Sequence, residues 1–120
     1  MPYGYDQSDW DTAKREARTL IVDRARTRGF IPYSDLAAGI NAINFAPHST
    51  SFFALLGELS EEEDAAGRGM MSALVVHKDG DMQPGPGFFD LAKRLGRDVR
   101  DIEKCWIAEF KKVHAALGVA

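Results

Sequence analysis

Three histidines and one cysteine are the side chains of this sequence best suited to nucleophilic catalysis or zinc binding. No two of His48, His77 and His114 are three or four residues apart, and Cys105 has no second cysteine beside it. Structural and catalytic zinc sites usually combine several closely spaced Cys and His ligands. Cys105 and His114 are nine positions apart, which places them on opposite faces of a helix at about 100° per residue. The spacing therefore predicts no catalytic residue, no metal site and no cofactor.

A run of acidic side chains dominates the middle of the chain: Glu58, Glu61, Glu62, Glu63 and Asp64. The run lacks the alternating oxygen ligands of a calcium-binding loop. Ser60 and Glu63 match a capping box, so we expect the helix to break and restart there. Two interpretations stay open for the acids. They form a solvated helix surface, or they form a docking face for a basic protein partner.

The charge of the chain is unevenly distributed around a net value of −3. Residues 31–69 hold one basic side chain, Arg68, and six acidic ones, whereas residues 88–120 hold seven basic and five acidic ones. Nucleic-acid-binding domains usually show a basic balance or a dense basic stripe. Because neither is present, we expect duplex DNA to bind only weakly at physiological salt.

Length and composition predict one globular domain. A chain of 120 residues with 45% hydrophobic and 28% charged side chains can bury a modest core. No apolar run approaches the ~20 residues of a membrane span, and the N-terminus lacks the features of a signal peptide. A single cysteine cannot form an intramolecular disulfide. We therefore expect a cytoplasmic protein with a flexible arm at residues 1–7 and one domain at residues 8–120.

Two helical stripes frame the sequence. The first has apolar residues at helical spacing: Trp10, Ala13, Ala17, Leu20, Ile21 and Ala25. The last has the same spacing: Ile102, Trp106, Phe110, Val113 and Leu117. We expect Trp106 and Phe110 to lie in the core. Apolar surface that the small core leaves over would favour a homodimer.

The centre of the chain predicts a hairpin between helices. Residues 35–40 and a segment beginning at residues 49–51 are expected helices. Residues 72–76 are short, apolar and partly β-branched, as in a strand. Asp79-Gly80 is a strong hairpin signal, and residues 81–83 would form the return strand. A helix would follow at residues 88–95. The expected fold is α+β, with four or five helices and a two- or three-stranded antiparallel sheet.

This order of elements is similar to that of a winged-helix domain. The chain also resembles a family of small uncharacterised bacterial proteins at four segments: Leu55-Leu-Gly-Glu58, Ala66-Gly-Arg68, Ser72-Ala-Leu-Val-Val76 and Pro86-Gly-Phe-Phe89. That resemblance covers roughly residues 30–96 and implies no established activity.

A weaker resemblance is to the DNA-binding domain of alkylguanine–DNA alkyltransferases, carried by Pro32-Tyr-Ser-Asp-Leu-Ala37. In that family a reactive cysteine follows the recognition helix in a Pro-Cys-His-Arg motif. Here the corresponding region, residues 72–77, has no cysteine, so alkyl transfer to sulfur is not expected. The likeness would be one of fold, which alone carries no function.

These observations lead to two main functional hypotheses and a third. A regulatory, DNA-associated winged-helix module would use six contact residues: Tyr33, Ser49, Thr50, Ser51, Arg68 and Lys78. A protein-interaction module would instead present its acidic third helix to a basic partner. Carboxylates on that helix would oppose phosphate contact, which separates the two hypotheses. A small enzyme of unknown reaction is the third hypothesis.

Overall fold

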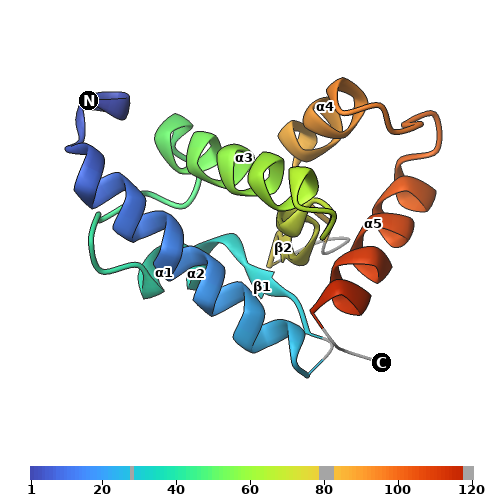
Figure 1. Cartoon of the computed structure of the whole chain (residues 1–120), viewed down its shortest axis with the longest axis horizontal. Helices are drawn as coiled ribbons and strands as arrows, with labels where there is room; N and C mark the ends of the chain where they lie inside the picture. The colour runs from blue at the N-terminus through green and yellow to red at the C-terminus, as the bar shows by residue number, and fades with distance from the viewer. Residues whose placement is uncertain (28, 79–82, 118–120) are drawn as a thin grey trace.

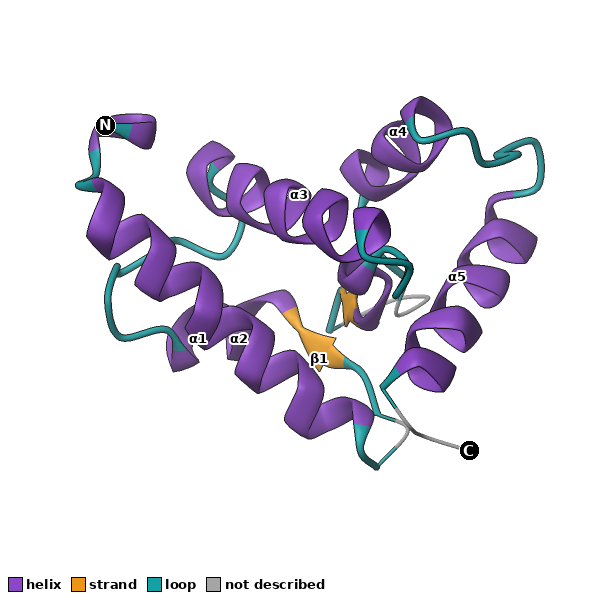
Figure 2. Cartoon of the chain, viewed as in Figure 1, coloured by secondary structure: helices purple, strands orange, loops and turns teal. Residues whose placement is uncertain are grey.

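The computed structural model describes residues 1–27, 29–78 and 83–117, and helices make up most of them (Figure 2). The α-helices are α1 (Gln7–Ala25), α2 (Tyr33–Gly39), α3 (Thr50–Ala65), α4 (Pro86–Arg94) and α5 (Ile102–Ala116). Two short 3-10 turns, η1 (Pro2–Gly4) and η2 (Met71–Leu74), and two strands, β1 (Ile31–Pro32) and β2 (Val75–Val76), complete the described elements. None of the described helices is long and apolar enough to cross a membrane.

The predicted winged-helix-like α+β fold, with its antiparallel sheet, is wrong. Strand β2 pairs in parallel with β1, with Ile31 opposite Val75 and Pro32 opposite Val76. Most of the expected strand at residues 72–76 is the turn η2. Val75 and Val76 are completely buried, and an apolar run without alternation is typical of a strand covered on both faces.

The expected hairpin falls largely outside the described residues. Asp79-Gly80 and the first two positions of the return strand belong to residues 79–82, which the structure does not describe. On either side of them, the His77 backbone N–H donates to the Gln83 carbonyl oxygen at 3.0 Å. After this closure the chain reaches Gly85, which precedes the first turn of α4.

Helix α1 confirms the predicted first stripe. Trp10 and Ile21 are fully buried, together with the stripe's three alanines, while Leu20 is half-buried. Alanines allow close approach, and α1 packs against α2, α3 and η2 (Figure 1). Tyr3 and Tyr5 of the expected flexible arm stack on the Trp10 indole, with ring centroids 5.5 and 6.2 Å away.

The core has two parts. The larger one lies among α1, α2, α3 and the two strands. The smaller one joins η2, α4 and α5 through Met70, Ala73, Phe88, Leu91, Ala92 and Cys105. Figure 1 shows α3 between α1 and α4, so this helix contributes to the surfaces on both sides.

The stripe predicted for the last helix is rotated in the structure. The buried line of α5 consists of Cys105, Glu109 and Val113. Trp106 and Phe110 are half-buried rather than central, and Ile102 is 49% exposed. Trp106 Nε1 still donates to the Ala73 carbonyl oxygen at 2.8 Å. Because the buried line contains the charged Glu109, a prediction from hydrophobic spacing alone selected the neighbouring face of α5.

Helix α3 is continuous through the expected break at Ser60. Its N-cap is Ser49, whose hydroxyl accepts from the Phe52 backbone N–H at 3.3 Å. Ser60 is completely buried, and its hydroxyl donates to Ser72 Oγ at 2.6 Å. The Ser60 hydroxyl therefore joins α3 to η2 instead of capping a second helix.

Candidate binding groove between α3 and α4

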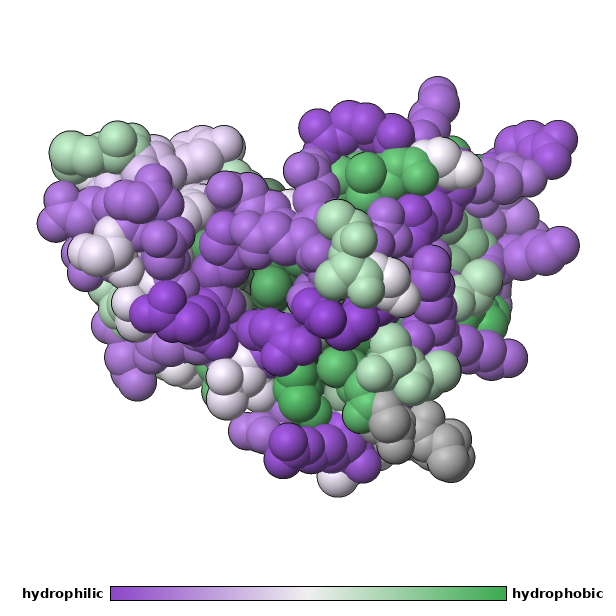
Figure 3. All heavy atoms as spheres, viewed as in Figure 1, coloured by the Kyte–Doolittle hydropathy of each residue, from purple (hydrophilic) through white to green (hydrophobic). Residues whose placement is uncertain are grey.

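A half-open groove of about 880 Å³ runs between α3 and α4. Its apolar walls come from Phe53, Ala54, Leu56, Pro86, Phe88 and Leu91. Pro2 and Tyr3 of the N-terminal segment also line it. In Figure 3 the outline of the molecule dips between the N-terminal end of the chain and α4. A largely apolar concave surface with a few polar groups is the usual form of a ligand-binding site.

Small residues on both helices keep the groove open. A Cβ at Gly57 on α3 or at Gly87 on α4 would meet no atom within 4 Å. Each glycine therefore leaves space where a side chain would stand. Phe53 lies one turn before Gly57 and is 44% exposed, so part of its ring is open to solvent. The local sequence thus places aromatic surface beside empty space.

Carboxylates predominate among the charged groups that line the groove. They are Glu58, Glu61 and Asp90, and they face one guanidinium, Arg94, which pairs with Glu61. Glu58 accepts a hydrogen bond from Trp10 Nε1 at 2.9 Å, yet its side chain stays 46% exposed. Asp90 is exposed. The rim of the groove is therefore acidic.

One end of the groove is polar, because Tyr33 and His77 line it with ring centroids 5.1 Å apart. Ser72 lines the groove as well, and both Tyr33 and Ser72 are at least nine-tenths buried. The Gly85 backbone N–H donates to Tyr33 Oη at 2.9 Å. Burial raises the pKa of Tyr33, although the bond from Gly85 partly opposes this effect. The phenol is therefore neutral at physiological pH and keeps its proton.

Aromatic rings surround this polar end. The Tyr33 ring contacts His77, Phe53 and His48 with centroid separations of 5.1, 5.8 and 5.9 Å. His48 and His77 are themselves 5.9 Å apart. These contacts hold the side chains from α2, α3 and the segment after β2 in one cluster.

The remaining predicted docking acids face away from the groove. Glu62 pairs with Lys14 of α1 at 2.7 Å, and Asp64 accepts from Arg97 Nη1 at 3.0 Å. Glu63 is only 3% exposed and pairs with two arginines from different segments. Of the five acids, Glu58 and Glu61 alone are among the groove-lining residues.

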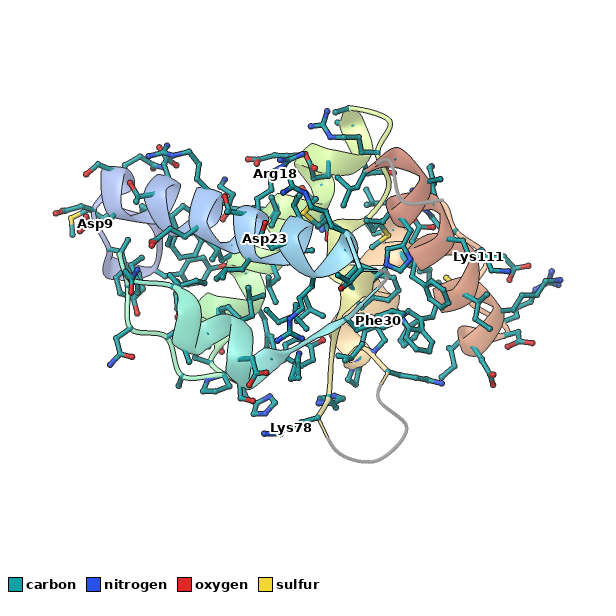
Figure 4. All side chains as sticks on the ribbon, turned by 90° about the horizontal axis from the view of Figure 1, so that it is seen from below. Asp9, Arg18, Asp23, Phe30, Lys78 and Lys111 are labelled. Carbon is teal, nitrogen blue, oxygen red and sulfur yellow. The ribbon has the colours of Figure 1, made fainter. Side chains whose placement is uncertain are left out.

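The buried Glu63 carboxylate holds two parts of the chain together. Glu63 Oε1 lies 3.0 Å from Arg18 Nε, and Glu63 Oε2 lies 2.6 Å from Arg68 Nη2. Figure 4 shows Arg18 on α1 at the side where α1 faces α3. Burial would raise the pKa of Glu63, but the bonds and charges of these arginines outweigh it and lower the pKa below 4.5. The carboxylate is therefore a charged structural anchor at neutral pH.

A second ionic network links α3 to α5. Arg97 Nη2 donates to Glu109 Oε1 at 2.8 Å, and Arg97 also pairs with Asp64. Glu109 Oε1 accepts from the buried Met70 backbone N–H at 3.1 Å. The hydrogen bond from Arg97 lowers the pKa of Asp64. This network connects α3, the residue before η2, and α5.

Of the six predicted DNA contacts, Arg68 lies apart from the others. Tyr33 and Thr50 line the groove, whereas Ser49 and Ser51 lie at the start of α3 and their hydroxyls are 3.3 Å apart. Arg68 follows the far end of this helix, about 24 Å along at 1.5 Å per residue, and is paired with Glu63. Lys78 is exposed and directly follows His77, whose ring centroid lies 5.1 Å from that of Tyr33.

Sequence reasoning did not select several residues that shape this groove: Phe53, Ser72, His77, Gly85 and Asp90. For two of these residues, Phe53 and Gly85, the sequence did contain a local signal. Phe53 is an aromatic residue off the buried line of α3, and Gly85 stands between a proline and Pro86. Ser72 and His77 gave no local signal, because a parallel strand pair brings their segment beside Tyr33.

The described residues contain no group of three His, Cys, Asp or Glu side chains placed to hold a metal ion. Cys105 is buried, and burial raises the pKa of its thiol, so it is a poor nucleophile at neutral pH. We find no protein-family model that matches the chain, and comparisons with curated proteins and with solved structures return no match.

Proposed function

We propose that the protein is a non-enzymatic interaction module that binds a basic, amphipathic segment of a partner protein in the groove between α3 and α4. The observation that carries this proposal is an apolar groove with an acidic rim. Amphipathic helices commonly bind by placing an apolar face in such a groove. This proposal keeps the hypothesis of a basic partner but moves the contact surface from the whole acidic run to the groove.

The apolar part of the groove supports a ligand with its own apolar side chains. Phe53 and Tyr3 are 44% and 59% exposed, although large apolar side chains are normally covered. Burying such surface contributes about 25 cal/mol per Å². A Cβ at Gly57 or at Gly87 would meet no atom within 4 Å, so a partner side chain has room to approach the backbone there.

The charges of the rim support a cationic partner over a nucleic acid. Asp90 and Glu58 are exposed carboxylates at the groove, and Arg94 is already paired with Glu61. Basic groups beside an apolar face would meet these carboxylates, which favours association and correct orientation. Phosphates at the same place would be repelled.

The test uses two synthetic helical peptides that differ only in charge, one of leucine and lysine and one of leucine and glutamate. We expect the leucine–lysine peptide to bind more tightly in fluorescence polarisation. Asp90→Lys should weaken its binding roughly tenfold, which corresponds to about 1.4 kcal/mol. Asp23→Lys makes the same charge change on α1, outside the groove-lining residues, and should leave affinity nearly unchanged.

Two outcomes would overturn the proposal. Equal binding of both peptides would show that the rim does not select charge. Tighter binding of a generic duplex of about 20 base pairs than of the leucine–lysine peptide would favour the DNA-associated alternative instead. Loss of affinity in Asp90→Lys but not in Asp23→Lys supports the groove as the binding surface.

A further inference from the structure

We infer that Tyr33, Ser72 and His77 form a hydrogen-bonding subsite for an amide group at the polar end of the groove. The inference rests on the proposed function, because it names the part of the bound segment that this end recognises. It concerns a different chemical contact from the acidic rim. The two can therefore be tested separately.

Two hydroxyl groups are positioned as donors to a ligand. Tyr33 Oη already accepts from the Gly85 N–H at 2.9 Å, and Ser72 Oγ accepts from the Ser60 hydroxyl at 2.6 Å. Each oxygen thus uses a lone pair within the chain, and its own proton has no acceptor among the described residues. Both side chains line the groove, so those protons are available to a ligand oxygen.

His77 faces the same point as Tyr33. A methyl group built at Gly85 would stand 3.3 Å from His77 Nε2 and 3.6 Å from Tyr33 Oη. Nε2 and Oη therefore both lie close to Gly85, where an added side chain would press against the imidazole. An imidazole nitrogen donates or accepts according to its tautomer. In the tautomer with a bare Nε2, it accepts an N–H beside the hydroxyl donors.

The surrounding charges select a neutral ligand group. The one guanidinium among the described groove-lining residues, Arg94, pairs with Glu61, and the rim carries further carboxylates. A carboxylate or phosphate would find no free cation among those residues and would meet like charge. An amide offers one acceptor and one donor without a net charge. A backbone or side-chain amide of the bound segment therefore fits both the donors and the acceptor.

Gly85 provides a direct test, because its φ of −73° is ordinary for alanine. Gly85→Ala keeps an ordinary backbone conformation but places a methyl group 3.3 Å from His77 Nε2, so the imidazole should be displaced from its position beside Tyr33 Oη. Asp23→Lys is the control, because Asp23 lies on α1 and outside the groove-lining residues. The probe is N-methylacetamide, titrated into isotope-labelled protein while the NMR shifts of position 85, Tyr33 and His77 are followed. Acetate serves as the charged comparison, and thermal unfolding checks each fold.

We expect N-methylacetamide to give saturable shifts in the unsubstituted protein and in Asp23→Lys. Apparent affinity should fall about fivefold in Gly85→Ala, as expected for loss of one hydrogen bond. Tyr33→Phe should give a similar loss. Undiminished binding to both variants, or equal binding of acetate, would overturn the subsite. Amide binding without leucine–lysine peptide binding would overturn the proposed function and keep the subsite. Peptide binding without amide binding would do the reverse.

Discussion

The two halves of α3 differ in how they use their side chains. The first half places the partly exposed Phe53 and the open position Gly57 beside the groove. The second half carries Glu63 and Asp64, and each is paired with arginine from another segment. Glu63 and Asp64 are therefore satisfied by the chain itself, whereas Glu58 and Glu61 of the same half line the groove. Charge density along a helix is a poor guide to its binding surface.

The contrast has an energetic basis. A buried carboxylate is tolerated only when partners offset its desolvation, and Glu63 has two arginines. An apolar side chain at a groove carries a smaller penalty, which a ligand can remove. The second half of α3, which we call the paired half, fixes α3 against α1 and α5. The first half, which we call the open half, is then held in place and presents a preformed surface.

The largest expected loss of stability comes from removing an arginine that pairs with the second half of α3. Arg97→Met keeps an apolar stem but removes the partner of Asp64 and Glu109. Because Glu109 is 5% exposed and would lose its cationic partner, the unfolding free energy should fall by about 3 kcal/mol. Arg100→Met is the control, since the Arg100 side chain is 91% exposed and its replacement should leave stability nearly unchanged. Chemical denaturation measures both, and equal losses would contradict the contrast.

A smaller loss of stability is expected when the buried Glu63 side chain loses only its charge. Glu63→Gln should reduce the unfolding free energy by about 2 kcal/mol, because charged hydrogen bonds to Arg18 and Arg68 become neutral. The neighbouring Glu62→Gln changes a carboxylate that is 58% exposed and should have little effect. Urea midpoints compare the two variants. An unchanged midpoint for Glu63→Gln would mean that the buried pair is not stabilising.

The buried Glu63 carboxylate also predicts how the stability of the protein changes at low pH. The pKa of Glu63 is lowered in the folded state, because its arginine partners outweigh burial. A lowered folded pKa adds stability that is present above the unfolded value near 4.5 and is lost as pH falls through the folded pKa. Stability should therefore decrease below about pH 4.5, and less steeply in Glu63→Gln. Parallel pH profiles for the two proteins would contradict this assignment.

The sequence predicted local helices better than the contacts between them. The stripe from Trp10 to Ala25 is buried as expected, because it depends only on helical periodicity. The sheet was mispredicted because Asp79-Gly80 favoured a local hairpin, whereas Val75 pairs with the distant Ile31. The role of the acids was equally hidden, since Glu63 meets Arg18 only after α1 and α3 pack. The groove could be predicted only at Phe53 and the glycines around α4.

The smallest expected effect on stability comes from the open half. Phe53→Ala should lower the unfolding free energy by about 1 kcal/mol, mostly through lost contacts with Tyr33 and His48. Leu55→Ala is the matched substitution on the same helix. Leu55 is completely buried, so its truncation should cost about 2–5 kcal/mol.

The affinity for the leucine–lysine peptide should show the opposite order. Phe53→Ala removes apolar surface that the bound peptide would cover, so binding should weaken about tenfold. Leu55→Ala, assayed where it remains folded, should retain most of its affinity because Leu55 does not line the groove. If Phe53→Ala proved as destabilising as Leu55→Ala and left peptide binding intact, Phe53 would belong to the core. The open half of α3 would then be structural as well, and the difference between its halves would disappear.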